Sequence, residues 1–294
     1  MDDSELVFPD GSNDAWATAR LQVREYQRLS GYIEELCGIR LPPNKQTLLE
    51  ARLRRRLRSL GMSDFKEYCE HVLSSERGLD EIVPMVDEIT TNKTDFFREP
   101  FHFDYLTNHA MPDLVKGGAG ARRELRVWSA ACSSGEEPYT LAMVVADFAQ
   151  TRIGFQYAVL GTDICTEVLE QAQRGVYPDD RIEPVPFLQR DRYFLRSKNR
   201  SARLVRVVPH LRAHVSFRRL NFLDRDYEMD DPMDVVFCRN VLIYFSRETQ
   251  ETVVNHIARH LRPGGYFFVG HAETLQGMDV GLRPVAPTVY RKDA

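Results

Sequence analysis

Residues 127–139 of the chain read VWSAACSSGEEPY. An apolar, β-rich run leads into a tight turn of small residues, and the turn opens a helical pattern in which Pro138 suits the first helical position. In an open α/β sheet such a turn lies at the carboxyl end of the first strand, where ligands bind. The stretch therefore predicts a strand, a ligand-binding turn and a helix in succession.

β-Rich runs keep alternating with helical stretches along the rest of the chain. The expected strands span residues 125–131, 155–161, 233–238 and 266–270, and the expected helices span residues 139–148, 167–174 and 249–261. This alternation predicts an α/β fold in which a parallel sheet is covered by helices on both faces.

Two places break this rhythm. Strand-like runs at residues 204–208 and 214–217 have no helix of crossover length between them, which predicts a small β insertion at about residues 177–219. Near the end of the chain, the run PTVY at residues 287–290 is expected to form a last, antiparallel edge strand.

The first part of the chain has a helical pattern instead. Apolar residues recur at helical spacing in residues 16–36, 44–60, 65–73 and 79–89. At 294 residues the chain exceeds the usual size of a single core, so two domains are expected. The predicted division is a mobile N-terminus at 1–15, a small all-α domain at 16–88, a linker at 89–100 and the α/β domain at 101–294.

Composition and charge narrow the class of protein. No apolar run approaches the roughly 20 residues needed to span a bilayer, and the start MDDSE lacks the basic residues of a signal peptide. We therefore expect a cytoplasmic protein without direct membrane insertion. The formal net charge of −4 makes the chain a poor candidate for general binding to nucleic acid.

The acidic start of the helix after the first turn limits the ligand. Glu136 and Glu137 would repel a pyrophosphate, and the glycine pattern of a dinucleotide site is absent, so a cationic or hydroxyl-rich ligand fits better. The alternative is a capping box formed by Ser133 with Glu136 or by Ser134 with Glu137.

Asp163 stands just past the second predicted strand. An acidic residue at this point of a doubly wound fold accepts hydrogen bonds from ribose hydroxyls, which favours a nucleoside ligand. The alternative role for Asp163 is an ordinary helix N-cap.

Four separated motifs complete the pattern. They are TTNKTDFFRE at residues 90–99, FCRNVLIYF at 237–245, the pair Gly264-Gly265, and GHAE at 270–273. Together, in this order, they resemble the CheR-type chemotaxis receptor methyltransferases, and the resemblance covers nearly the whole chain from about residue 20. It implies a methyltransferase fold with a Rossmann-like doubly wound sheet, and the cofactor S-adenosylmethionine. The implied reaction forms methyl esters on glutamate side chains in the cytoplasmic helical domain of chemotaxis receptors.

The resemblance also implies roles for individual residues. Arg98 and Tyr244 would be catalytic, and whether Glu136 or Glu137 contacts the amino-acid part of the cofactor stays open. The cofactor-binding residues implied by the matching motifs are Asn92, Thr94, Arg98, Glu136, Asp163, Asn221, Phe222, Arg239 and Asn240. No metal is expected. The alternative for Arg98 is a surface ion pair with Asp95 or Glu99.

One basic cluster stands out on the second predicted helix, formed by Arg52, Arg54, Arg55, Arg56 and Arg58. It is interpreted either as a solvated helix face or as a surface for the acidic receptor helices. The stretch RSKNRSAR at residues 196–203 has no glycine, unlike the insertion loop of family members that dock on a C-terminal receptor pentapeptide. We therefore expect no dependence on that pentapeptide.

Two other functions remain possible at this point. A methyltransferase that acts on nucleic acid would be expected to carry an Asn-Pro-Pro-aromatic pattern after the fourth strand, where this chain has Arg239-Asn240-Val241-Leu242. A module that binds the cofactor or the receptor without turnover is the other alternative.

Overall fold

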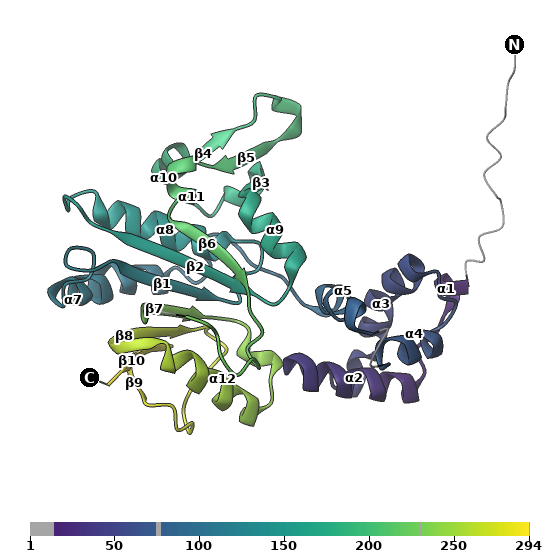
Figure 1. Ribbon diagram of the computed structural model, residues 1–294. Helices are drawn as coiled ribbons and strands as arrows, with labels where there is room; N and C mark the ends of the chain where they lie inside the picture. Colours follow the sequence, from purple (N-terminus) through teal and green to yellow (C-terminus); the bar gives the residue numbers. More distant parts are fainter. Residues whose placement is uncertain (1–14, 75–77, 230, 294) are drawn as a thin grey trace, which may run out of the picture. The chain divides into compact units, whose positions relative to one another are not determined.

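The computed structural model describes residues 15–74, 78–229 and 231–293. The expected mobile N-terminus falls almost wholly on residues 1–14, outside the described part. The chain divides between Thr90 and Thr91 into a helical unit and a larger α/β unit (Figure 1). No helix in the described ranges is both long and apolar enough to cross a membrane.

The helical unit contains four of the expected helical segments, with one difference. Its elements are α1 (Ala15–Thr18), α2 (Val23–Cys37), η1 (Pro43–Lys45), α3 (Gln46–Leu60), α4 (Phe65–Val72) and α5 (Leu79–Ile89). The prediction of one continuous helix over residues 16–36 is wrong, because the chain breaks between α1 and α2. At this break the backbone of Leu21 bonds to α3 side chains, with Glu50 accepting from its N–H at 2.8 Å and Gln46 donating to its carbonyl at 2.5 Å.

The α/β unit is built on a seven-stranded sheet in the order β6-β2-β1-β7-β8-β10-β9. Its strands are β1 (Leu125–Ala130), β2 (Tyr157–Asp163), β6 (Val215–Arg219), β7 (Met233–Cys238), β8 (Leu261–Val269), β9 (Leu282–Ala286) and β10 (Val289–Lys292). The first five of these are parallel, and β10 and β9 are added antiparallel. The predicted parallel sheet is confirmed.

Helices cover both faces of this sheet. The longer helical segments of the unit outside the insertion are α6 (Phe101–Tyr105), the π-helical η2 (Leu106–Ala110), α7 (Met111–Lys116), α8 (Glu136–Ala149), α9 (Thr166–Arg174) and α12 (Arg247–Arg259). From β1 the chain passes through α8 to β2 on one side, whereas from β7 it passes through α12 to β8 on the other. Since parallel crossovers are right-handed, α8 and α12 lie on opposite faces, as Figure 1 shows.

A second sheet of three strands, in the order β3-β5-β4, forms the insertion. Its elements are β3 (Val176–Pro178), η3 (Asp179–Ile182), α10 (Phe187–Tyr193), β4 (Phe194–Arg196), η4 (Arg200–Ala202), β5 (Leu204–Val207) and α11 (Pro209–Arg212). The prediction that the run at 214–217 also belongs to the insertion is wrong. That run overlaps β6, which pairs in parallel with β2 in the main sheet because α9 supplies the crossover before the insertion begins.

The predicted last strand is also placed differently. It corresponds to β10, but β10 lies between β8 and β9 and is not an edge. β9 was not predicted; it carries Pro284, and none of its side chains is fully buried.

Candidate active site

The two halves of the main sheet diverge between β1 and β7, and this is the topological switch point of the fold. β1 ends at Ala130 directly beside Cys238, the last residue of β7. In open α/β sheets a ligand binds in the crevice outside the carboxyl ends of such strands. The turn predicted to bind a ligand follows β1 at this position.

The backbone around the crevice is unusually strained. Five non-glycine residues in three segments near it have positive φ angles: Phe97, Glu99, Ala131, Ser133 and Asn240. Such conformations cost roughly 1–3 kcal/mol each and concentrate at functional sites. The three segments are the stretch before α6, the turn after β1 and the turn after β7.

The turn after β1 is held by hydrogen bonds from its own residues. Ser133 donates its N–H to Oδ2 of Asp163 at 2.8 Å and its hydroxyl to the carbonyl of Asn92 at 2.9 Å. Gly135, with φ 95°, precedes α8 as its N-cap. The capping-box alternative is therefore wrong, and the Ser134 hydroxyl instead donates to Oε2 of Glu136 at 2.7 Å.

The two glutamates at the start of α8 have different partners. Oε1 of Glu136 accepts from Arg181 at 2.7 Å, whereas Glu137 accepts from Ser129 at 2.6 Å and from Arg239 at 2.7 Å. Both carboxylates are buried and each has one arginine counter-ion. The geometry leaves open which of them contacts the cofactor.

Asp163 is a buried carboxylate at the end of β2. Its Oδ1 accepts from the N–H of Cys165 at 3.0 Å, and Cys165 is the N-cap residue of α9. The alternative role of Asp163 as helix N-cap is therefore wrong. The N–H of Leu220, which follows β6, donates to the Asp163 carbonyl at 2.9 Å, so the segment with Asn221 and Phe222 begins beside this aspartate.

The segment before α6 contributes Asn92, Thr94 and Arg98. The Asn92 amide donates to Sγ of Cys165 at 3.5 Å, and the Thr94 carbonyl accepts from Arg181 at 2.6 Å. Arg98 is half-buried and donates to the carbonyl of Lys93 at 3.1 Å.

The ion-pair alternative for Arg98 is wrong. In the described part of the chain Arg98 pairs with neither Asp95 nor Glu99, since Asp95 pairs with Arg181 at 3.1 Å and Glu99 with Arg239 at 3.4 Å. The guanidinium of Arg98 thus keeps N–H groups that can hold an anion.

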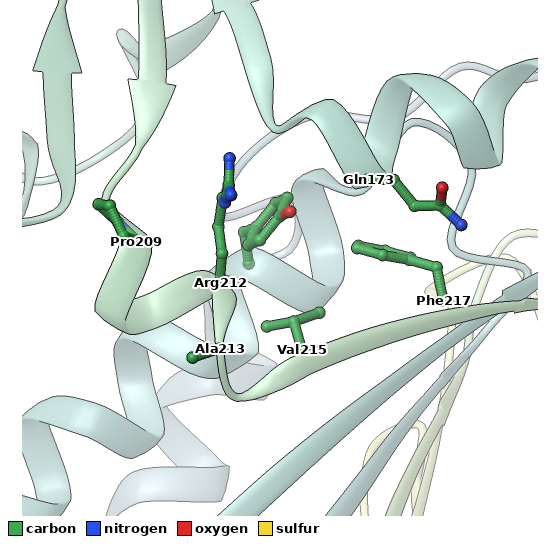
Figure 2. Close-up of a pocket in the computed structure, with 7 residues that line it drawn as sticks. Gln173, Pro209, Arg212, Ala213, Val215 and Phe217 are labelled. Carbon is green, nitrogen blue, oxygen red and sulfur yellow. The ribbon is translucent and has the colours of Figure 1, made fainter.

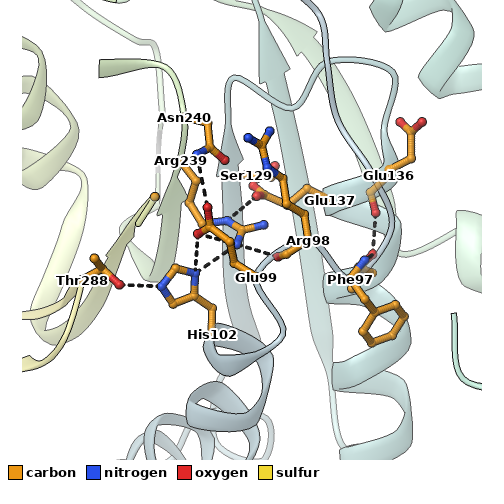
Figure 3. Close-up of polar contacts among 12 residues, drawn as sticks. Phe97, Arg98, Glu99, His102, Ser129, Glu136, Glu137, Arg239, Asn240 and Thr288 are labelled. Carbon is orange, nitrogen blue, oxygen red and sulfur yellow. Dashed lines mark hydrogen bonds and ion pairs between the residues drawn. The ribbon is translucent and has the colours of Figure 1, made fainter. Parts of the chain in front are cut away.

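Arg239 is the centre of a buried polar network (Figure 3). Its side chain is only 2% exposed, and besides Glu137 it donates to the carbonyl of Arg98 at 2.8 Å and to Nδ1 of His102 at 3.0 Å. It also lies 5.4 Å above the ring of Phe237. Arg239 therefore connects β7, α8 and the segment before α6.

His102 is neutral in this network. Burial, and then the charge of Arg239, lowers the pKa of His102 to about 4. Its Nδ1 accepts from Arg239, so its Nε2–H donates to Oγ1 of Thr288 at 2.7 Å. His102 is thereby unsuited to act as a base toward a ligand.

Glu99 is the second carboxylate bound to Arg239. Burial alone would raise its pKa, but the charge of Arg239, the amide of Asn240 and the N–H of His271 together hold that pKa below its ordinary value. Glu99, His102 and His271 have potential ligand atoms within 4.8 Å of one another, as a metal site would need. The guanidinium of Arg239 lies against two of them, so a metal ion would be repelled there.

Tyr244 ends the short 3-10 helix η5 (Leu242–Tyr244), which follows Asn240. Its side chain is half-buried. Three residues that shape this site were not predicted: Arg181, His102 and Glu273. Glu273 stood inside the GHAE motif, whereas Arg181 carried no signal because only the folded insertion brings it to Glu136.

A separate cavity of about 330 Å³ lies beside β6 and between α9 and α11 (Figure 2). Its lining residues are Tyr139, Gln173, Pro209, Arg212, Ala213, Val215 and Phe217. None of the predicted site residues is among them, so the cavity is distinct from the crevice.

The predicted partner-binding arginines lie on α3 in the helical unit, and most of them bond within it. Arg54 pairs with Glu50 at 2.6 Å and Arg52 donates to the carbonyl of Ile89. Arg56 makes two hydrogen bonds to buried Glu81, at 2.8 and 2.7 Å. These three arginines therefore stabilise the packing of the helical unit and do not form a fully solvated helix face.

Arg55 and Arg58 are the exposed members of the cluster. Arg55 pairs with Glu88 at 2.5 Å, and Arg58 lies over the Trp16 ring at 5.4 Å.

Comparison with known families defines the class of protein. Residues 92–290 match the family model described as "CheR methyltransferase, SAM binding domain", and residues 24–90 match "CheR methyltransferase, all-alpha domain". The α/β unit is thus a methyltransferase domain that binds S-adenosylmethionine. The chain belongs to the CheR methyltransferase family.

Curated relatives are similar over nearly their whole length. The chain is 35% identical to the chemotaxis protein methyltransferase of Borreliella burgdorferi, over 92% of this chain and 94% of the relative. It is 39% identical to the chemotaxis protein methyltransferase of Escherichia coli, over 93% of each chain. It is also 39% identical to chemotaxis protein methyltransferase 2 of Pseudomonas aeruginosa, over 90% of this chain and 92% of the relative.

Proposed function

We propose that this enzyme transfers the methyl group of S-adenosylmethionine to glutamate side chains in the cytoplasmic helical domain of chemotaxis receptors. The observation that carries the proposal is the match of both domains to one family, with relatives named chemotaxis protein methyltransferases over at least 90% of this chain. Such a substrate implies that the enzyme works in the cytoplasm.

The residues of the crevice suit a reaction that moves no proton. A glutamate has a reference pKa near 4.3, so it is ionised at neutral pH and needs no catalytic base. This agrees with His102, which is neutral, buried and bonded on both ring nitrogens. When bound, S-adenosylmethionine would supply a methyl carbon on a positively charged sulfur; the carboxylate oxygen would bond to that carbon as the carbon–sulfur bond breaks, and S-adenosylhomocysteine would leave.

Positioning is then the main task of the protein. Holding two reactants in line can contribute roughly 7–11 kcal/mol to lowering the barrier. We assign Arg98 to orient the glutamate carboxylate, because the residue is half-buried and, among the residues that the structure describes, its guanidinium bonds only to the Lys93 carbonyl. Tyr244 is assigned a hydrogen bond to the substrate or the cofactor.

The cofactor-binding assignments follow the strand ends. Asp163 at the end of β2 would bind the ribose, and Asn221 with Phe222, which follow β6, would lie by the adenine. The amino-acid part of the cofactor would then lie near the turn after β1, where Glu136 is buried.

The substrate is tested by transfer of a labelled methyl group to a receptor cytoplasmic fragment, followed by mild alkali. Release of the label as methanol is the expected result, because methyl esters hydrolyse readily. Label that survives alkali would indicate nitrogen methylation and contradict the proposal. Tight binding of S-adenosylhomocysteine with no transfer at all would indicate a binding module.

We also propose that receptor binding does not require a C-terminal pentapeptide. The support is the connection from β4 to β5, residues 197–203, which lacks glycine and contains the 3-10 turn η4. Equal affinity for receptor fragments with and without the pentapeptide is expected. A markedly higher affinity in its presence would show the proposal to be wrong.

A further inference from the structure

The carboxylate of Glu273 accepts hydrogen bonds from backbone N–H groups that follow β7 and β8. Its Oε2 accepts from Asn240 at 2.8 Å and from Gly270 at 2.6 Å, and its Oε1 accepts from Leu242 at 2.8 Å. The side chain is buried, with 7% of the residue exposed. One side chain after β8 thus holds the turn that follows β7.

The backbone held in this way is strained and closely packed. Asn240 has φ 59°, a conformation that few non-glycine residues adopt. A Cβ atom at Gly270 would lie 2.5 Å from Nδ2 of Asn240 and 2.9 Å from Oε2 of Glu273. The side chain of Asn240 is fixed separately, since its amide donates to Glu99 at 3.2 Å. Strain of this kind persists only where the surroundings impose it.

We propose that Glu273 is a positioning residue for methyl transfer, whose carboxylate fixes the turn at residues 240–244 so that Asn240 and Tyr244 are held at the crevice. This inference rests on the roles proposed above for Asn240 and Tyr244. In the proposed role Glu273 acts through this turn and does not itself contact the substrate or the cofactor.

A carboxylate suits this task better than an amide. Both oxygens of Glu273 accept hydrogen bonds, so one of them would become an N–H₂ group in glutamine and would face a backbone donor. Burial raises the pKa of Glu273 above its ordinary value, and the charge-assisted bonds from the backbone offset part of that cost. Replacement by glutamine therefore keeps the shape of the side chain but removes at least one of the bonds that hold the turn.

The test is a double-mutant cycle in the full-length enzyme. In the first cycle Glu273→Gln is combined with Tyr244→Phe, and kcat is measured on a receptor fragment. In the second cycle Glu273→Gln is combined with Asn240→Ala, and the Kd of S-adenosylhomocysteine is measured. We expect Glu273→Gln alone to lower kcat about 100-fold, the size of effect that a misplacement of about 1 Å produces. In the Tyr244→Phe or Asn240→Ala background we expect most of the corresponding effect to be absent, because the residues act as one unit.

Asp234→Asn is the matched control. Asp234 is a fully buried carboxylate at the other end of β7 and pairs with Arg123 at 2.6 Å. Its replacement should lower Tm and leave kcat and the Kd unchanged. Should Glu273→Gln fail to fold, Glu273→Asp retains the charge and displaces both oxygens, and it enters the same cycles.

Effects that multiply fully in both cycles, or an unchanged kcat in Glu273→Gln, would overturn the proposal. If Tyr244→Phe alone leaves kcat unchanged, the proposed role of Tyr244 is wrong and the Asn240 cycle decides the role of Glu273. If both single replacements are silent, Glu273 cannot act through these residues and the inference is also wrong.

Discussion

At the scale of single residues, two kinds of side chain surround the crevice. Buried charged groups bond to one another and hold the backbone, whereas half-buried groups can contact a ligand. Glu99 and Glu137 both pair with Arg239, whereas within the described ranges Arg98 bonds only to a backbone carbonyl. The motifs predicted Arg98 and Arg239 alike as pocket residues. Sequence alone could not separate their surroundings, because burial and partners depend on contacts more than 100 residues apart along the chain.

The proposed role of Arg98 predicts a specific loss in the Arg98→Ala variant. A charge-assisted hydrogen bond contributes roughly 1.5–3 kcal/mol, so kcat/KM for the receptor fragment should fall about 10- to 150-fold. Methyl-transfer kinetics check this, with the Kd of S-adenosylhomocysteine measured in parallel. An unchanged kcat/KM would remove Arg98 from the mechanism, and a loss confined to the Kd would make it a cofactor residue only.

His102 predicts a pH dependence of stability. Its folded-state pKa of about 4 lies below the ordinary histidine value of about 6.5, so the unfolded chain binds a proton that the folded chain rejects. Stability from this group is present above pH 6.5 and is lost as the pH falls toward 4. Between pH 7 and pH 5 the free energy of unfolding should decrease by about 2 kcal/mol through His102.

The measurement is urea unfolding of the wild type and of His102→Asn, whose Oδ1 can still accept from Arg239. The pH-dependent loss should be about 2 kcal/mol smaller in the variant. His210→Asn, at an exposed histidine, is the control and should behave like the wild type. Identical pH dependence in His102→Asn would mean that His102 titrates normally.

At the scale of elements, the local sequence pattern predicted the strands and helices whose bounds depend mainly on nearby residues. The bounds of β7 agree with the prediction, and the strand, turn and helix at residues 125–149 form as expected. The wrong predictions concern strands whose place depends on pairing with distant residues. β6 pairs with β2 in the main sheet, and β9 pairs with β10. The break between α1 and α2 likewise depends on Glu50 and Gln46 in α3.

The turn after β1 packs so closely at Gly135 that a side chain there would clash with its neighbours. A Cβ atom there would lie 2.8 Å from Cβ of Ala172 and 2.9 Å from Oη of Tyr177, and the φ angle of 95° adds backbone strain. Gly154 is a matched control, since its φ is 76° but a Cβ would meet nothing within 4 Å. Gly154→Ala should cost about 1–2 kcal/mol, the penalty for a left-handed conformation alone.

Gly135→Ala should cost about 1–3 kcal/mol more than that, because the turn is also overpacked. It should weaken binding of S-adenosylhomocysteine as well, whereas Gly154→Ala should not. Thermal unfolding and calorimetric titration of both variants check this. Equal costs for the two replacements would mean that the turn has room to relax.

At the scale of the whole molecule, two units share one chain with a net charge of −4, so attraction to an acidic partner must be local. In α3, Arg52, Arg54 and Arg56 are half-buried and bond to groups of the helical unit. Arg55 and Arg58 are exposed, although Arg55 pairs with Glu88 of the same unit at 2.5 Å. The sequence predicts the cluster either as a solvated helix face or as a surface for receptor helices, and we propose the second role for Arg55 and Arg58 because they are exposed.

Charge reversal at Arg55 and Arg58 should therefore slow encounter with an acidic receptor. At low ionic strength the double variant Arg55→Glu/Arg58→Glu should raise KM for the receptor fragment about tenfold, and the difference should shrink at higher salt because screening shortens the reach of these charges. Arg24→Glu/Arg28→Glu, at two exposed arginines of α2, changes the net charge equally and should alter KM little. Similar effects of both pairs would indicate a response to net charge alone, and the α3 surface would then lose its proposed role in receptor binding.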